Sequence, residues 1–197
     1  YFQYDQHYLE YGHSLSPFRL KFLSELQPSL DKAQALHGVF ADSLPDGWGR
    51  LLMDRWLRQQ GYVPQHIGLM QRLALVGEKG VGALRYRPNY DIADKELLNL
   101  FQLGQQAQAI FEGHSEQVLA RLVNVASSGG ARPKALIYLN PDNQHMISQP
   151  QQGYQPWLVK FTSNNLALGH DEGRCEAAYL TMAAQVGISV PEWRLYQ

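Results

Sequence analysis

The residues best suited to chemistry lie in Ser127–Lys134, which reads Ser-Ser-Gly-Gly-Ala-Arg-Pro-Lys. Two adjacent glycines let a backbone approach a ligand closely and adopt positive φ angles at no side-chain cost. Two hydroxyl groups precede the glycines and two cations follow them. Small residues, backbone N–H groups and positive charge are what a polyphosphate needs. The alternative is a plain glycine turn with Arg132 and Lys134 on its solvent side, and the stretch alone does not decide between the two.

A lysine on an apolar strand is the second feature that could take part in chemistry. Lys160 lies in Trp157–Phe161, which reads Trp-Leu-Val-Lys-Phe, and this composition predicts a largely buried strand. A buried ammonium group needs a partner, although a lysine near an edge can also extend into solvent. Glu172 and Glu176 follow it four residues apart, so they share one face of a helix predicted over 171–187.

The order of these features strengthens the phosphate interpretation. A glycine-rich loop, a strand lysine and a helix glutamate follow one another as they do in the N-lobe of protein kinases. In kinases the loop covers the ATP phosphates, and the lysine binds phosphate while the glutamate holds it. The joint pattern therefore favours a nucleotide site in which Lys160 contacts phosphate and Glu172 or Glu176 is its partner.

Other candidate residues have simpler explanations. Asp46 lies in the turn Leu44–Arg50, where its side chain can bond its own backbone, and this turn role accounts for it. The segment Gly77–Gly82 lacks the G-x-G-x-x-G order, so it is expected to be a tight loop. Cys175 is expected to be a small core residue rather than a nucleophile. The seven histidines show no metal-ligand spacing, so no metal site is predicted.

Composition restricts the class of protein. The 197 residues fit one large domain or two small lobes, and 45% hydrophobic and 18% charged residues are ordinary for a globular chain. A net charge of −1 argues against bulk nucleic-acid binding. The single cysteine fits the reducing cytoplasm. No apolar run reaches the roughly 18 residues of a membrane span. Because the chain starts at Tyr1 in sequence that already looks structured, we expect it to be a fragment.

Hydrophobic periodicity and turn residues predict an α+β fold with a lobe boundary near 87–90. Helices are expected over 51–60, 65–76, 94–111, 115–126 and 171–187, with Ser115 as a helix cap. Strands are expected near Phe2–Tyr4 and over 83–86, 135–139, 145–148, 157–161 and 188–196, with a turn at 141–143.

Six stretches carry a resemblance to a known family. They are residues 2–4, 40–47, 77–84, 127–134, 157–161 and 176–192. In these stretches the chain resembles the HipA family, bacterial serine/threonine kinases that act as toxins in type II toxin–antitoxin systems. The two specific segments are Gly-Gly-Ala-Arg-Pro-Lys and Trp-Leu-Val-Lys-Phe in this order.

The resemblance implies a fold and a set of site residues. Residues 1–90 would form a HipA-type N-terminal subdomain, and residues 91–197 a kinase-like N-lobe with a helical lead-in. Ser127 would be the autophosphorylated serine that switches the kinase off, and Glu176 is preferred over Glu172 as the lysine's partner. The implied nucleotide-binding residues are Ser128, Gly129, Gly130, Ala131, Lys134, Lys160 and Glu176.

The resemblance also implies what this chain lacks. The family's catalytic aspartate, its neighbouring asparagine and its Mg²⁺-binding aspartate lie in a C-terminal kinase lobe. This chain contains no H-R-D-x-x-x-x-N or Asp-Phe-Gly segment. We therefore expect no catalytic residue and no metal ligand here, and no phosphate transfer by this chain alone. The intact protein is expected to use ATP and Mg²⁺.

The family implies partners as well. A HipB-like DNA-binding antitoxin and a protein substrate are expected. In studied relatives the substrate is an aminoacyl-tRNA synthetase. Direct contact of this chain with nucleic acid or with a membrane is not expected. The alternative is a non-catalytic protein-interaction module that retains the kinase N-lobe fold.

Overall fold

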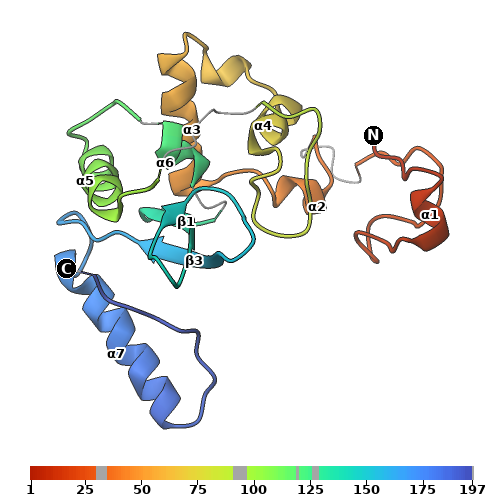
Figure 1. The fold of residues 1–197 in the computed structure, drawn as a ribbon. Helices are drawn as coiled ribbons and strands as arrows, with labels where there is room; N and C mark the ends of the chain where they lie inside the picture. The colour runs from red at the N-terminus through yellow and green to blue at the C-terminus, as the bar shows by residue number, and fades with distance from the viewer. Residues whose placement is uncertain (30–34, 91–96, 119, 126–128, 197) are drawn as a thin grey trace. The chain divides into compact units, whose positions relative to one another are not determined.

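The computed structural model describes residues 1–29, 35–90, 97–118, 120–125 and 129–196 (Figure 1). The chain divides into two compact units. One combines Tyr1–Pro45 with Val63–Asp91, and the other combines Asp46–Tyr62 with Ile92–Gln197. Helices together with a three-stranded antiparallel sheet confirm the predicted α+β class. The predicted division into residues 1–90 and 91–197 concerns family domains and stays a prediction.

The first unit consists mainly of short helices and an aromatic cluster. Its helices are α1 (Tyr8–Tyr11), α2 (Gly38–Ala41), the 3₁₀ helix η1 (Pro64–His66) and α4 (Leu69–Val76). The strand predicted near Phe2–Tyr4 is reduced to one bridge, in which Phe2 and Gln27 exchange backbone hydrogen bonds of 2.9 and 2.7 Å. The rings of Phe2 and Tyr4 pack edge to face with centroids 4.7 Å apart. Aromatic packing therefore takes the place of a longer strand.

The strand predicted over residues 83–86 is wrong, because these residues are irregular. The Tyr86 N–H donates to the Gly77 carbonyl at 3.1 Å, and the Tyr86 hydroxyl donates to Ser43 Oγ at 2.6 Å. The backbone bond closes residues 77–86 into a local loop, so the Tyr86 N–H is used within this loop rather than in a strand pair.

The second unit carries the larger core. Its helices are α3 (Gly47–Gln59), α5 (Leu100–Phe111), α6 (Ala120–Asn124), the 3₁₀ helix η2 (Gly169–Asp171) and α7 (Glu172–Gln185). In α3, Trp48 and Leu52 lie one helical turn apart and are fully buried, so this helix belongs to the second unit's core. The core cluster consists of Trp48, Leu52, Leu98, Leu103, Ala107, Ile110, Val118, Leu122, Val125, Ala135 and Ile137.

The sheet has the strand order β2-β1-β3, with β1 (Lys134–Leu139), β2 (Met146–Ile147) and β3 (Gln155–Lys160). Burial alternates along β1, so that one of its faces packs on the core and the other does not. The predicted hairpin between β1 and β2 is confirmed. The prediction of a largely buried β3 is wrong, because its outward residues Leu158 and Lys160 are exposed.

Two helices begin later than the sequence predicts, because the described residues expected at their starts are irregular. The predicted residues 94–96 lie outside the described residues, and α5 begins at Leu100 because Asn99 Oδ1 accepts the Gln102 N–H at 3.1 Å. Ser115 is not a helix cap: its Oγ accepts the Gln117 N–H at 3.2 Å in a turn, and residues 115–118 are irregular. Of the helix predicted over 115–126, the described residues that are helical are those of α6, Ala120–Asn124.

The strand predicted over 188–196 is also wrong, since these residues are irregular. Pro191 lacks the N–H that a sheet ladder needs. The segment instead places the Arg194 guanidinium over the Trp157 ring, 5.0 Å from its centroid. A cation–π contact therefore replaces strand pairing at this end of the chain.

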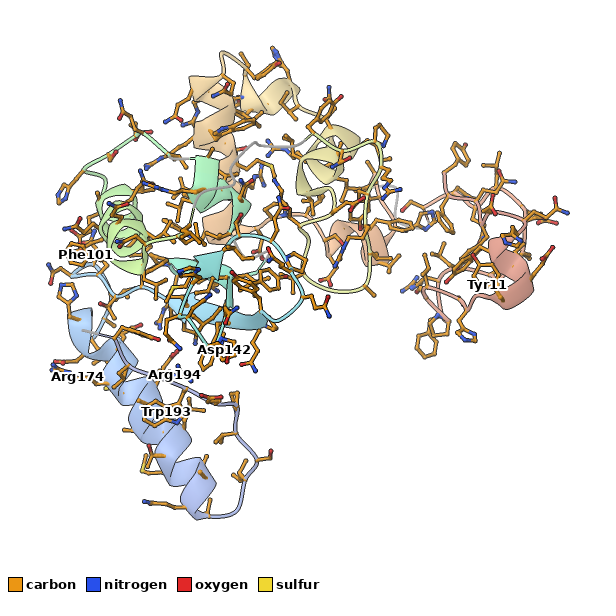
Figure 2. All side chains as sticks on the ribbon, in the orientation of Figure 1. Tyr11, Phe101, Asp142, Arg174, Trp193 and Arg194 are labelled. Carbon is orange, nitrogen blue, oxygen red and sulfur yellow. The ribbon has the colours of Figure 1, made fainter. Side chains whose placement is uncertain are left out.

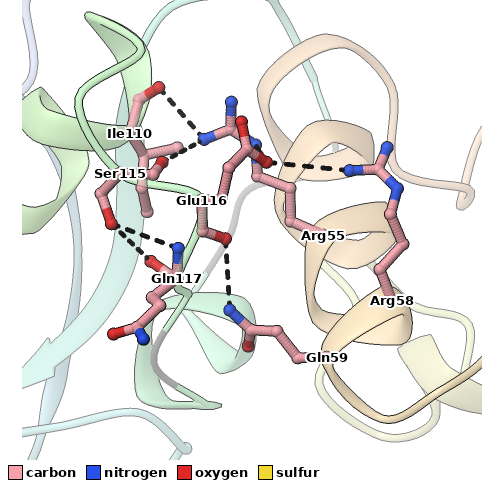
Figure 3. A network of polar contacts seen from close by, with 7 residues as sticks. All are labelled: Arg55, Arg58, Gln59, Ile110, Ser115, Glu116 and Gln117. Atoms are coloured by element: carbon pink, nitrogen blue, oxygen red, sulfur yellow. Dashed lines mark hydrogen bonds and ion pairs between the residues drawn. The ribbon is translucent and has the colours of Figure 1, made fainter.

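A polar network joins α3 to the end of α5 (Figure 3). The side chain of Arg55 is only 11% exposed, and its Nη1 donates to the carbonyls of Ile110 and Ser115 at 3.2 and 2.7 Å. Its Nε lies 3.2 Å from Glu116 Oε2. The Ile110 carbonyl belongs to the last turn of α5 and also accepts the Gly113 N–H at 3.2 Å, so Arg55 adds a further donor to this helix end from a distant part of the chain.

Arg55→Met is expected to destabilise the second unit by about 1–3 kcal/mol, because the partly buried Ser115 carbonyl loses its side-chain donor while the Ile110 carbonyl keeps the Gly113 N–H and the apolar stem is retained. Chemical denaturation followed by circular dichroism measures this change. Arg58→Met is the matched control, because Arg58 is 54% exposed and only 3.9 Å from Glu116. We expect that variant to change stability by less than about 0.5 kcal/mol. Equal effects of the two variants would contradict the capping role.

Glu112 anchors the chain that leaves β3. Its Oε1 accepts hydrogen bonds from Ser163 Oγ, the Asn164 N–H and Gln108 Nε2 at 2.7, 3.1 and 3.1 Å. The hydrogen bond from Ser163, followed by that from Gln108, lowers the pKa of Glu112 below its ordinary value near 4.5. These bonds favour the ionised carboxylate, so the segment that leads toward α7 is held best when Glu112 is charged.

This pKa shift predicts an acid-sensitive part of the stability. A lowered pKa in the folded state stabilises the protein above the ordinary glutamate pKa, and this stabilisation is lost as pH falls through the folded-state pKa. We expect Glu112→Gln, whose amide oxygen still accepts hydrogen bonds, to lose less stability than the wild type between about pH 5 and pH 2. Denaturation midpoints measured across this range test the prediction. Parallel pH profiles of the two proteins would contradict it.

Candidate phosphate-binding site

Two lysines lie opposite each other at one end of the sheet. The register pairs Lys134, the first residue of β1, with Lys160, the last residue of β3. Directly paired residues of antiparallel strands point to the same face, with Cβ atoms about 5 Å apart. The neighbouring residue Ala135 is buried in the core, so the two lysines lie on the opposite face. The structure thus brings together two of the residues predicted to bind nucleotide.

Each candidate glutamate on α7 pairs with a different cation. Lys160 Nζ lies 2.6 Å from Glu176 Oε1, and both side chains are about half exposed, at 55% and 49%. Glu172 instead accepts from Arg132 Nη1 at 2.6 Å. The lysine–glutamate pair expected of a kinase N-lobe is therefore Lys160 with Glu176. An ion pair this exposed contributes at most about 1 kcal/mol to stability.

The second lysine folds back over the glycine loop. Lys134 Nζ donates to the Gly129 carbonyl at 2.6 Å. Gly130 has φ +83°, a backbone conformation that favours glycine, and the end of the Lys134 side chain lies directly over it. Ala131 is exposed beside it. The other two predicted loop residues, Ser127 and Ser128, lie outside the described residues.

A turn from a distant part of the chain holds the same loop, and the sequence interpretation missed it. Asp46 does not cap its own helix with its side chain. Its Oδ1 accepts the Gly130 N–H at 2.9 Å, across 84 positions in sequence. The Trp48 N–H donates to the Gly130 carbonyl and Trp48 Nε1 donates to the Lys134 carbonyl, both at 3.0 Å. The local turn role assigned to this aspartate is therefore wrong, and no local sequence pattern indicates the contact.

The site as described is electrically balanced. Arg132, Lys134 and Lys160 carry three positive charges, and the carboxylates of Asp46, Glu172 and Glu176 carry three negative charges. Each cation already has an acceptor within 2.6 Å. Each cation has further N–H donors for a phosphate, but the three carboxylates offset the positive charge that would attract it, which limits the affinity.

The sheet face that carries the lysines is apolar next to them. The register pairs Leu136 with Leu158, two residues from Lys134 and Lys160 respectively, so these side chains share the lysine face. Leu158 is 52% exposed. Trp157 belongs to the opposite face and packs against the core cluster. An exposed apolar surface beside two ammonium groups suits a ligand with a flat ring and a charged tail.

The residues that the structure describes contain no cluster of three or more histidine, cysteine, aspartate or glutamate side chains able to hold a metal ion. Within the same residues, no helix has the length and apolar character required to cross a bilayer.

Comparison with known proteins gives two matches. The family model described as the HipA N-terminal domain matches residues 1–87, and the model described as the HipA-like C-terminal domain matches residues 126–197. The second match begins just before the glycine loop and includes β1, β3 and α7. No curated protein and no solved structure matches the chain.

Proposed function

Because the chain belongs to the HipA family, we propose that it forms the nucleotide-binding part of a serine/threonine protein kinase of that family. The observation that supports this function best is the placement of Lys134 and Lys160 opposite each other at the end of a glycine loop. The Lys160–Glu176 pair supports the same assignment, since kinases hold their phosphate-binding lysine in this way.

Each residue has a defined role in this proposal. The ammonium groups of Lys134 and Lys160 bind phosphate oxygens through N–H donors other than those bonded to the Gly129 carbonyl and the Glu176 carboxylate. Charge-assisted hydrogen bonds of this kind are about twice as strong as neutral ones. Glu176 positions Lys160 before the nucleotide arrives. The apolar pair Leu136 and Leu158 offers a surface for the adenine ring.

The remaining functions proposed for the intact protein follow from the family. ATP is the phosphate donor and a protein side chain the acceptor, with Mg²⁺ supplying charge neutralisation when bound. Among the described residues we assign no ligand to this metal. Ser127 is proposed as the autophosphorylation site, and a HipB-type antitoxin as a partner. Phosphoryl transfer requires aspartates of the kinase type in addition to the residues assigned here.

Calorimetric titration of this chain with ATP, ADP and adenosine tests the nucleotide proposal. We expect weak binding that strengthens with the number of phosphates and weakens with salt, because the lysines supply most of the attraction. Equal binding of adenosine and ATP would contradict a phosphate site. An absence of binding to all three compounds would contradict nucleotide binding by this chain.

A second candidate function is a non-catalytic protein-interaction module. The observation that favours it is that Arg132, Lys134 and Lys160 each already have an acceptor within the fold. The two candidates make different predictions for Lys160→Ala in a longer protein that includes the catalytic lobe. Lost phosphorylation and toxicity with retained folding support the kinase. Unchanged toxicity supports the interaction module.

A further inference from the structure

We propose that residues 46–48 act as a clamp that fixes the conformation of the glycine loop, with Asp46 as its positioning residue. The inference rests on the proposed function in one respect, because it assigns the clamp an effect on phosphate binding. Its structural part stands on contacts within the second unit and does not require any ligand.

Three hydrogen bonds form the clamp. Asp46 Oδ1 accepts the Gly130 N–H at 2.9 Å, and the Trp48 N–H donates to the Gly130 carbonyl at 3.0 Å. Both backbone groups of the central loop glycine are thus bonded to the same turn. Trp48 Nε1 also donates to the Lys134 carbonyl at 3.0 Å, which fixes the point where the loop becomes β1.

Close packing supports the same conclusion. Gly47, between the two clamping residues, has φ +40°. A Cβ atom added to it would lie 2.7 Å from the Gly130 carbonyl oxygen and 2.8 Å from Ala131 Cα. Real side chains essentially never approach backbone this closely, so the turn and the loop touch only because residue 47 is glycine. The ring of Trp48 is buried in the core and anchors the turn itself.

Fixing this loop matters because glycines are costly to order. Gly129 and Gly130 lose more conformational freedom on immobilisation than other residues do. If the loop becomes ordered only when the ligand binds, the free energy of ordering it weakens the binding. A loop that is already held in place does not weaken binding in this way. The clamp therefore raises phosphate affinity without touching phosphate.

The charge of Asp46 acts in the opposite direction. A carboxylate bonded to the loop N–H stands near the anion that the loop is proposed to bind, and like charges repel. Asparagine keeps an oxygen that accepts the Gly130 N–H but carries no charge. Alanine removes both. These two substitutions separate the hydrogen bond from the charge.

The experiment compares the wild type with Asp46→Asn, Asp46→Ala and the control Asp142→Ala, all in this 197-residue chain. Asp142 is an exposed aspartate in the β1–β2 turn (Figure 2). The first measurement is hydrogen exchange of the Gly130 amide by nuclear magnetic resonance, without ligand. We expect Asp46→Ala to lower its protection by at least about tenfold, and Asp46→Asn and Asp142→Ala to leave it nearly unchanged.

The second measurement is ATP affinity by calorimetry on the same four proteins. We expect Asp46→Ala to weaken binding about three- to tenfold and Asp46→Asn to bind at least as tightly as the wild type. A purely structural role would lower the melting temperature without this ordering of affinities. Trp48→Phe provides a second test, since it removes the Nε1 donor while a smaller aromatic ring keeps part of the core contact. It should weaken ATP binding in the same direction.

Each outcome decides the proposal. Unchanged Gly130 protection in Asp46→Ala overturns the clamp. Lost protection with unchanged ATP affinity overturns the positioning role, and tighter binding by both Asp46 variants shows that Asp46 competes with phosphate instead. If the wild type binds no ATP, the proposed function fails. The hydrogen-exchange comparison then still supports or overturns the clamp on its own.

Discussion

Lys160→Ala is expected to weaken ATP binding by this chain by about 10- to 100-fold while leaving its unfolding midpoint nearly unchanged. The loss follows from removing a charged donor to phosphate, which is worth roughly 1.5–3 kcal/mol. Removing the lysine also leaves the Glu176 carboxylate unpaired beside the site, where it repels the ligand. The midpoint stays because the lost ion pair is half exposed. Calorimetry with ATP and thermal denaturation measure the two quantities.

Arg174→Ala is the matched control for this prediction. Arg174 pairs with Asp171 at 2.9 Å near the start of α7, and its side chain is 64% exposed, so it resembles Lys160 in exposure and in pairing. It is expected to change neither ATP affinity nor stability by a measurable amount. If both substitutions weakened ATP binding equally, the effect would reflect general charge rather than a phosphate ligand at Lys160.

Trp48→Ala is expected to destabilise the second unit by about 3–5 kcal/mol, the largest stability change that we predict for one substitution. The ring is 1% exposed within the main core cluster, so alanine leaves a cavity in addition to losing buried apolar surface. The indole N–H bond to the Lys134 carbonyl is lost as well. A change of this size is a large share of the 5–15 kcal/mol that typically holds a domain together.

Chemical denaturation followed by circular dichroism tests this prediction, with Trp193→Ala as the control of the same residue type. Trp193 lies in the irregular segment after α7 and is 39% exposed (Figure 2). We expect it to cost less than about 1 kcal/mol. Similar losses of unfolding free energy for the two substitutions would contradict the placement of Trp48 in the second unit's core.

Local sequence patterns predicted most elements near the site. The apolar run 135–139 and the Pro141–Asn143 turn gave a correct hairpin, because a strand pair joined by a short turn depends on neighbouring residues. The helix that contains Glu172 and Glu176 was also predicted correctly in its main part, since its apolar residues follow helical spacing and Gly187 is a local stop signal. The predicted strands at 83–86 and 188–196 failed, because a strand needs a partner that its own residues do not specify.

The sequence by itself determined which residue types could meet phosphate: two glycines, two lysines and a helix glutamate in a fixed order. Their spacing was enough to reach the family, since each signal spans only a few residues. The tertiary structure decided which groups pair. The sheet register set Lys134 opposite Lys160, and the helix position gave Glu176 rather than Glu172 to Lys160. It also brought Asp46 to Gly130 across 84 positions, a contact that depends on how α3 packs into the core and that no local pattern encodes.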